Sequence, residues 1–215
     1  MSVEITPPPA VSRREIVEAA ERIIGDVGAE RFTTGLLLDG DTSATIGSVY
    51  RHFADRVHII VAVRAENGRR MLDRINQAVL LQHRDVASED LFHDAVASLY
   101  RLRPSMRHLR PGGEDSDAWW WALARSLHLA MGNSDRRRTT QVVRLHAAMV
   151  HAAFALDPEG DAAMLAQALG WLRDAVREAR DAALDEVARH GSGARGFDGS
   201  GYAAAGLLSP VVDAV

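Results

Sequence analysis

The sequence predicts an all-α fold, because helix-start signals recur along the chain and each precedes apolar residues at helical spacing. Ser12 and Glu15 form the pattern of a capping box, in which each residue bonds the backbone of the other. Asp55 stands before a long segment with an apolar stripe, and two long alanine-rich segments follow residue 133. Side chains three or four positions apart share one face of a helix, so each segment can bury one side. The 215 residues suffice for one or two globular domains.

The N-terminal part is expected to be a flexible arm, residues 1–11, followed by a helix. The arm contains prolines, and the first helix-start signal comes after it. Beyond Ser12, isoleucine, alanine and valine recur at helical spacing as far as Val27. Gly28 then provides a natural C-terminal stop, since glycine accepts the backbone angles that end a helix.

Residues 32–53 predict two short helices that meet at a tight turn. Thr33 can cap the first through its hydroxyl, and residues 39–41, Asp-Gly-Asp, let it end. Thr45 can cap the second. By helical spacing, the residues of this second helix expected to pack inward are Ile46, Val49, Tyr50 and Phe53, and those on other faces are Gly47, Ser48, Arg51 and His52. Such a unit can place a helix in a groove of DNA.

Five further helical segments are predicted in the rest of the chain. A long helix over residues 55–82 joins the N-terminal part to everything after it, and a helix from Ser88 is stopped by Pro104. A third helix is predicted over residues 118–131. The fourth starts at the cap Ser134 and ends at Leu156. The fifth starts at Asp157 and Pro158 and ends near His190. A glycine- and serine-rich flexible tail is expected over residues 191–215.

The run IGSVYRHF at residues 46–53, followed by Asp55 and Arg56, resembles the recognition helix and following turn of the tetracycline-repressor (TetR) family. The resemblance covers residues 12–64. The chain departs from the family pattern at residues 38–39 and 42–45, where Leu-Asp and Thr-Ser-Ala-Thr replace the usual Ile-Ala and Ala-Gly-Val-Ser. The resemblance implies a helix-turn-helix DNA-binding head over residues 12–54 and a helical ligand-binding and dimerisation domain over residues 55–190. It also implies a transcriptional regulator, by family default a repressor that a small apolar molecule releases from its operator.

DNA-binding residues can be assigned by role. The N-terminal part of a recognition helix faces base edges, while the N-termini of the neighbouring helices and basic side chains face phosphates. Tyr50 resembles the family's phosphate-contacting tyrosine. The residues expected to contact DNA are Thr33, Thr34, Thr45, Ile46, Gly47, Ser48, Tyr50, Arg51, His52 and Arg56. Read without the resemblance, His52 is more often a packing or surface residue than a DNA contact, and the ring of Tyr50 can equally be a half-buried core aromatic.

A ligand pocket is the second feature that the resemblance implies. Apolar and aromatic residues with a few polar anchors are typical of such pockets. The candidates are Phe92, Tyr100, Trp120, Leu123, His128, Met131, His146 and Met149, although ordinary core packing explains each of them singly. Ligand and DNA are expected to oppose each other through the long helix of residues 55–82, which would set the separation of two heads.

The last long helix carries an apolar stripe broader than one helix should leave exposed. In the TetR family the last two helices pair with their copies in a dimer, and the residues expected in that interface are Met164, Ala168, Trp171, Leu172, Ala175, Val176 and Ala179. The alternative is that the stripe packs wholly inside its own subunit.

Composition narrows the possible functions. The net charge of −4 argues against a general nucleic-acid binder, but a specific binder can use a few local contacts. Zero cysteines exclude disulfides and thiolate chemistry. No apolar run approaches the ~20 residues of a membrane span, so a cytoplasmic location without membrane contact is expected. The expected partners are an operator in double-stranded DNA, a small-molecule effector and a second copy of the chain.

Two rival functions stay open at this point. One is a helix-bundle metal enzyme, since Asp55 with His58 and Asp90 with His93 each place an acid three residues before a histidine. Short aspartates and the lack of paired core glutamates weaken it, so no catalytic residue, metal or cofactor is expected. The other is a dimeric ligand-binding module that does not bind DNA. The segment Asp39-Gly40-Asp41 favours it, because its two carboxylates would repel phosphate.

Overall fold

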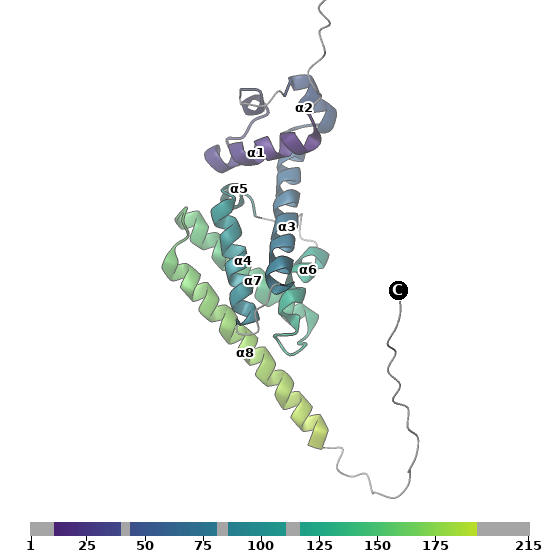
Figure 1. Ribbon diagram of the computed structural model, residues 1–215, viewed down its shortest axis with the longest axis vertical. Coiled ribbons are helices and arrows are strands. Elements are labelled where there is room, and N and C mark those ends of the chain that lie inside the picture. Colours follow the sequence, from purple (N-terminus) through teal and green to yellow (C-terminus); the bar gives the residue numbers. More distant parts are fainter. Residues whose placement is uncertain (1–10, 40–43, 81–85, 111–116, 193–215) are drawn as a thin grey trace, which may run out of the picture.

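The structure of the protein is a computed structural model that describes residues 11–39, 44–80, 86–110 and 117–192. Every regular element in these ranges is helical, which confirms the predicted all-α fold. A small group of short helices sits at one end of the long helix α3 (Arg56–Leu80), and a larger bundle surrounds the other end (Figure 1). We call the first group the head and the second the body. None of the helices within the described ranges is long and apolar enough to cross a membrane.

The head contains α1 (Arg13–Val27), the single 3-10 turn η1 (Gly35–Leu37) and α2 (Ile46–His52), packed on the first turns of α3. Their apolar side chains form one buried cluster. Its fully or almost fully buried members include Ile16, Ala20, Ile24, Phe32, Leu37, Val49, Phe53, Ile59 and Val63. This cluster fixes the position of α2 relative to α1 and α3.

Three predicted end signals of the head are confirmed. Ser12 and Glu15 make the capping box that starts α1, and Gly28 ends that helix at a φ of 85°. Asp55 starts α3, because its carboxylate accepts the backbone N–H of His58 at 3.0 Å. The flexible arm was predicted over residues 1–11, of which residues 1–10 lie outside the described part of the chain. Val11 itself is buried in the head.

The predicted helix from Thr33 is wrong. Only the three residues of η1 are helical there, and within the described part of the chain neither Thr33 nor Thr34 makes a side-chain cap bond at its start. Gly35 follows directly, and glycine costs about 1 kcal/mol relative to alanine inside a helix. One turn is enough to bury Phe32 and Leu37, so packing rather than helix propensity holds this segment.

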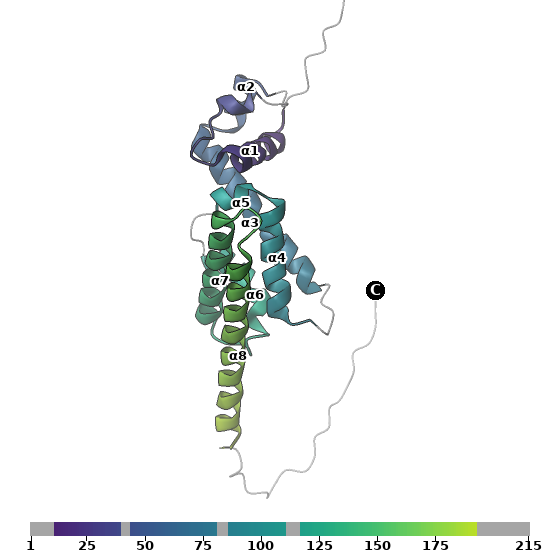
Figure 2. The same cartoon turned by 90° about the vertical axis from the view of Figure 1, so that its left-hand side faces the viewer.

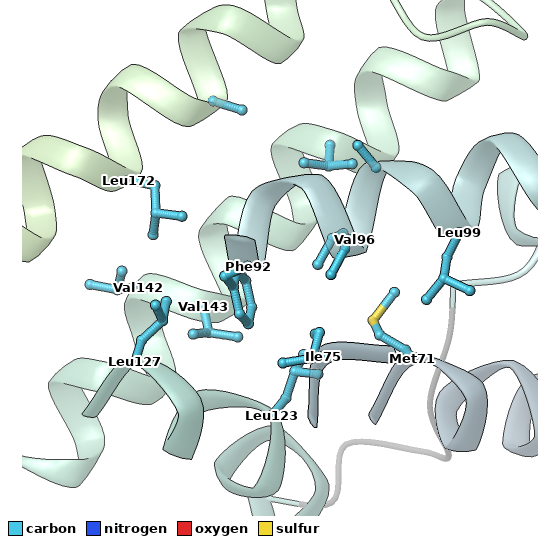
Figure 3. Packing of buried hydrophobic residues seen from close by; sticks show 14 of the residues in the cluster. Met71, Ile75, Phe92, Val96, Leu99, Leu123, Leu127, Val142, Val143 and Leu172 are labelled. Carbon is cyan, nitrogen blue, oxygen red and sulfur yellow. The ribbon is translucent and has the colours of Figure 1, made fainter. Parts of the chain in front are cut away.

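The body consists of the far half of α3 and five helices after it (Figures 1 and 2), namely α4 (Ser88–Leu102), α5 (Ser105–His108), α6 (Asp117–His128), α7 (Arg136–Leu156) and α8 (Ala162–Ser192). Side chains from all five of these helices meet those of α3 in one apolar core, and Figure 3 shows those of α4, α6, α7 and α8. Met71 and Ile75 come from α3, Phe92 from α4, Leu123 from α6 and Leu172 from α8. The body is therefore a helical bundle built around the end of α3.

The starts of the last two helices differ from the prediction by a few residues. Asp135, not Ser134, caps α7, since its carboxylate accepts the backbone N–H of Arg138 at 3.3 Å. The last helix starts at Ala162 rather than at Pro158. Gly160 has a φ of 87°, which interrupts any helix through it, and Asp161 accepts the N–H of Met164 at 2.8 Å. Pro158 thus lies in the turn before α8.

The apolar stripe of α8 is buried mainly against its own chain. Four of the predicted interface residues, Ala168, Leu172, Val176 and Ala179, have at most 2% of their surface exposed in the single chain. They have no surface left to bury against a second copy, so this part of the dimer prediction is wrong. The predicted residues Met164, Trp171 and Ala175 are half-buried at the edge of the same core. Ala183 still lies against Gly132 of the body, and the exposed residues 184–190 form the end of α8 that projects past it (Figures 1 and 2).

Candidate functional site

The head holds α2 through a reciprocal cap at its first turn. The hydroxyl of Thr45 accepts the backbone N–H of Ser48 at 3.2 Å, and the hydroxyl of Ser48 accepts the N–H of Thr45 at 2.9 Å. The Ser48 hydroxyl also donates to the carbonyl of Thr45 at 2.7 Å. These bonds satisfy backbone groups that a helix start leaves unpaired, so the predicted Thr45 cap is confirmed.

One side of α2 is buried and the other is open. Val49 and Phe53 are buried in the head, as predicted. Ile46 is 61% exposed and Tyr50 is 52% exposed, so the prediction that both pack inward is wrong. A helix of seven residues touches the head along a narrow strip, which Val49 and Phe53 already fill. Gly47 and Arg51 are exposed as well, and α2 lies at one end of the molecule (Figure 1). Ile46, Gly47, Tyr50 and Arg51 therefore make up the exposed side of this helix. We call these four residues the outward face of α2.

Ser48 and His52 do not lie on free faces of α2, contrary to the prediction. The Ser48 side chain is buried and its hydroxyl is used in the cap. A ring nitrogen of His52, Nε2, lies 3.0 Å from the carbonyl oxygen of Val11. Ser48 therefore stabilises the start of α2, whereas His52 joins α2 to the residue that precedes the cap of α1.

The Arg56 side chain also makes hydrogen bonds within the head. Its Nη2 donates to the carbonyl of Ala29 at 2.6 Å and to that of Glu30 at 3.1 Å. These bonds tie the loop after α1 to the first residue of α3. The guanidinium was predicted to meet DNA phosphate, but its donors at Nη2 are occupied by protein carbonyls.

A cavity of about 210 Å³ lies in the body between α3, α4, α6 and α7. Two alanines of α7 and the side chains of Met71, Tyr100, Arg110, Trp120, Arg144 and His151 line it. The Tyr100 hydroxyl and Nδ1 of His151 are 3.3 Å apart. Larger hollows of about 580 and 620 Å³ lie between α1 and α3, but mostly charged side chains line them. The cavity in the body is therefore the better candidate for an apolar ligand.

Comparison with solved structures identifies the architecture. The chain matches the crystal structure of a TetR-family transcriptional regulator from Streptomyces coelicolor with a TM-score of 0.63. The chain has a TetR-like fold. The match covers 76% of this chain and 96% of the other, at 24% sequence identity. No family model and no curated protein matches the sequence.

The predicted ligand residues of the TetR-like body are divided between the cavity and the core. Tyr100 and Trp120 line the cavity. Phe92, Leu123 and Met131 are completely buried in the core, Met149 packs at its edge, and the ring of His128 stacks edge-on against Trp121. Sequence reasoning missed Met71, Arg110, Arg144 and His151, because helical spacing does not tell which residues of different helices face each other.

His146 was predicted as a polar anchor but is buried away from the cavity. Its Nε2 lies 2.9 Å from Nδ1 of His93, and burial lowers the pKa of His146 to about 3. Burial also lowers the pKa of His93. The pair is consequently neutral at physiological pH and forms a polar bridge between α4 and α7.

The residues of the metal-enzyme alternative have other partners. Asp55 caps α3 and bonds the ring of His58, which lowers the pKa of its carboxyl group. Asp90 accepts two bonds from Arg173 on α8, at 2.8 and 2.9 Å. Within the described ranges, no three histidine or carboxylate side chains are grouped so as to hold a metal ion.

The reciprocal cap of α2 gives a stability prediction for the TetR-like head. Replacing Thr45 with alanine removes the hydroxyl that accepts the Ser48 N–H, which should lower the free energy of unfolding by about 1 kcal/mol. Chemical denaturation monitored by circular dichroism measures this change. Thr33→Ala is the matched control, because Thr33 is exposed and does not cap η1, and it should leave stability unchanged. Equal losses in both variants would contradict the cap assignment.

Arg56 gives a second prediction, on stability rather than on phosphate binding. Arg56→Ala removes two bonds from a charged donor and should destabilise the protein by about 2 kcal/mol. Denaturation measures the loss. If Arg56 instead contacts phosphate, the variant will keep its stability and will bind DNA with a weaker dependence on salt.

Proposed function

We propose that the protein is a DNA-binding transcriptional regulator that acts as a homodimer and responds to a small molecule. The outward face of α2 supports this proposal most directly. Its four residues are exposed although two of them, Ile46 and Tyr50, are large and apolar or aromatic. A seven-residue helix that exposes such side chains at the tip of a TetR-like fold is suited to enter a DNA groove.

The proposed DNA contacts divide into base edges and phosphates. Ile46 stands at the first position of α2 and can meet a thymine methyl group. A Cβ added to Gly47 would meet nothing within 4 Å in the described part of the chain, so the backbone there is open to a base edge. Tyr50 and Arg51 provide a hydroxyl and a cation for phosphate oxygens. The backbone around Thr33 and Thr34 contributes further phosphate contacts, whereas Ser48, His52 and Arg56 stabilise the head.

A homodimer supplies the second head that two adjacent half-sites require. We propose an interface formed by α7 and α8 with their copies. Support comes from large apolar side chains that these helices expose, namely Leu145, Leu156, Leu184 and Val187. Met164, Trp171 and Ala175 of α8 are half-buried at the edge of the body core. Pairing of α8 would cover its projecting end.

Response to a small molecule is proposed from the cavity in the body. By linkage, a ligand that favours one arrangement of α3 and the heads weakens DNA binding if DNA favours another. Repression is the direction we propose, so that ligand releases the protein from its operator.

Binding to the DNA upstream of the protein's own gene tests this function. In a mobility-shift titration, a fragment of this DNA should be bound saturably. The protein concentration required should be at least about a hundredfold lower than for a random duplex of equal length. Sedimentation equilibrium on the same protein should give a dimer. Binding of both duplexes at the same concentration, or of neither, would favour a ligand-binding module without DNA recognition.

A further inference from the structure

The cavity in the body has an unusual charge balance. Two arginines, Arg110 and Arg144, line it together with the neutral polar groups of Tyr100 and His151. No aspartate or glutamate of the described residues lines it. The rest of the lining is apolar or aromatic. A small cavity that combines apolar walls with two cations, and has no described carboxylate in its lining, favours a ligand that is apolar at one end and anionic at the other.

Arg144 is only weakly neutralised by the protein. Its Nη2 donates to Asp117 at 2.8 Å, but the Asp117 side chain is 85% exposed, and exposed ion pairs contribute little. The Nε of Arg144 is buried and has no hydrogen-bond partner among the described residues. A buried donor without an acceptor is costly, and an acceptor from a bound molecule would relieve that cost. The Arg144 guanidinium also lies over the ring of Trp120, 5.4 Å from its centre.

Arg110 acts on the cavity electrostatically. Burial lowers the pKa of His151, and the charge of Arg110 lowers it further. Burial raises the pKa of Tyr100, and the same charge opposes that rise. Arg110 is therefore near both groups. It is exposed and lines the cavity, so its charge can reach a bound anion.

We propose that the cavity binds a small monocyclic aromatic carboxylate. The carboxylate lies between Arg110 and Arg144, and the ring packs on Trp120, Tyr100 and Met71. The cavity volume of about 210 Å³ is below the ~300–1,000 Å³ of typical ligand pockets, which limits the ligand to one ring with a short substituent. Guanidinium groups bind carboxylates with strong, charge-assisted hydrogen bonds. As a choice of effector, this ligand rests on the proposed function. Binding of the acid to the cavity does not require that the protein binds DNA.

The position of Arg110 connects the cavity to the head. The preceding residue, Leu109, is buried in the apolar cluster of the head, whereas Met106 on α5 is buried in the core of the body. The turn of α5 also packs on α1, where Pro104 lies 3.0 Å from the position of a Cβ at Gly25. Asn67 of α3 donates to the hydroxyl of Ser105 at 3.1 Å. A ligand that shifts the backbone of Arg110 would therefore act on the neighbouring Leu109 in the head core.

Ligand titration without DNA tests the proposal. Tryptophan fluorescence and calorimetry are measured with benzoate, phenylacetate and 4-hydroxybenzoate, and with the matching uncharged amides. At least one acid should bind saturably with one site per chain, and its amide should bind about tenfold or more weakly. Failure of all three acids to bind, or equal affinity of acid and amide, would overturn the proposal.

Variants locate the site. Arg110→Gln and Arg144→Gln should each weaken acid binding by about tenfold or more and leave the affinity of the amide unchanged. The matched control is Arg125→Gln, an exposed arginine on α6 outside the cavity, which should bind the acid as the wild type does. Equal weakening in all three variants would show general attraction by positive charge and would contradict the site.

The two proposals can fail separately. Acid binding by a protein that does not recognise DNA would support the ligand site and contradict the regulator. DNA recognition by a protein that binds none of the acids would support the regulator and contradict the ligand site.

Discussion

Arg51→Glu is expected to weaken specific DNA binding by about a hundredfold. Arg51 lies on the outward face of α2, is exposed, and stands in the last turn of the helix. A charge-assisted bond to phosphate is worth about 1.5 kcal/mol, and a dimer loses two of them, which together correspond to about two powers of ten in affinity. Fluorescence anisotropy with a labelled operator fragment measures the change.

Salt dependence separates this loss from unfolding. Each phosphate contact adds about 0.9 to the slope of log affinity against log salt concentration, so the variant should lose about one unit per subunit. Arg74→Glu is the matched control, because Arg74 is exposed on α3 in the body. It should keep both the affinity and the slope. A folded Arg51→Glu variant with wild-type DNA affinity would exclude α2 as the DNA-contacting helix.

Leu172→Ala is expected to lower the free energy of unfolding by about 2–5 kcal/mol. Leu172 on α8 is completely buried in the body core (Figure 3). Its truncation removes apolar contacts and leaves a cavity inside one subunit. Denaturation at several protein concentrations measures the loss, which should be the same at concentrations where the chain is monomeric and where it is dimeric.

Leu184→Ala is the counterpart on the projecting end of the same helix. Leu184 is 61% exposed, so its truncation should leave the stability of the monomer unchanged and should raise the dissociation constant of the dimer. If Leu172→Ala instead weakens dimerisation and leaves the monomer stable, the stripe of α8 belongs to the interface after all.

The sequence predicts helix ends best where a cap is local. Ser12, Thr45 and Asp55 each bond a backbone N–H three residues ahead, and Gly28 ends α1 by its own backbone angles. Such signals are complete within a few residues. Thr33 carries the same chemistry but starts no helix, because Gly35 follows it and η1 is held by packing instead.

Which face of a helix is buried depends on what lies opposite, and spacing alone leaves this open. Ile46 and Tyr50 repeat at the same period as Val49 and Phe53, yet the head covers only the latter two. The stripe of α8 was predicted to face a second chain, but the body core of the same chain covers Leu172 and its neighbours. In both cases the neighbouring helices decide, and they are distant in sequence.

The cavity is the least predictable feature. Arg110 follows a short helix, and Arg144 and His151 belong to α7, so their shared surroundings appear only in the assembled bundle. The sequence pointed to aromatic residues, of which Tyr100 and Trp120 do line the cavity. The arginines that give the cavity its charge carried no signal of their own.

Directed cleavage from residue 47 tests whether α2 enters the major groove of DNA. The chain has no cysteine, so Gly47→Cys creates a single attachment point for an iron chelate that cuts nearby DNA. The added side chain meets open space. We expect cuts in two clusters about one helical turn apart, ~34 Å, on the operator fragment. Asp185→Cys on the projecting end of α8 serves as control and should produce no cuts. Absence of cuts from position 47 on bound DNA, or cuts from position 185 instead, would show that α2 does not lie in the groove.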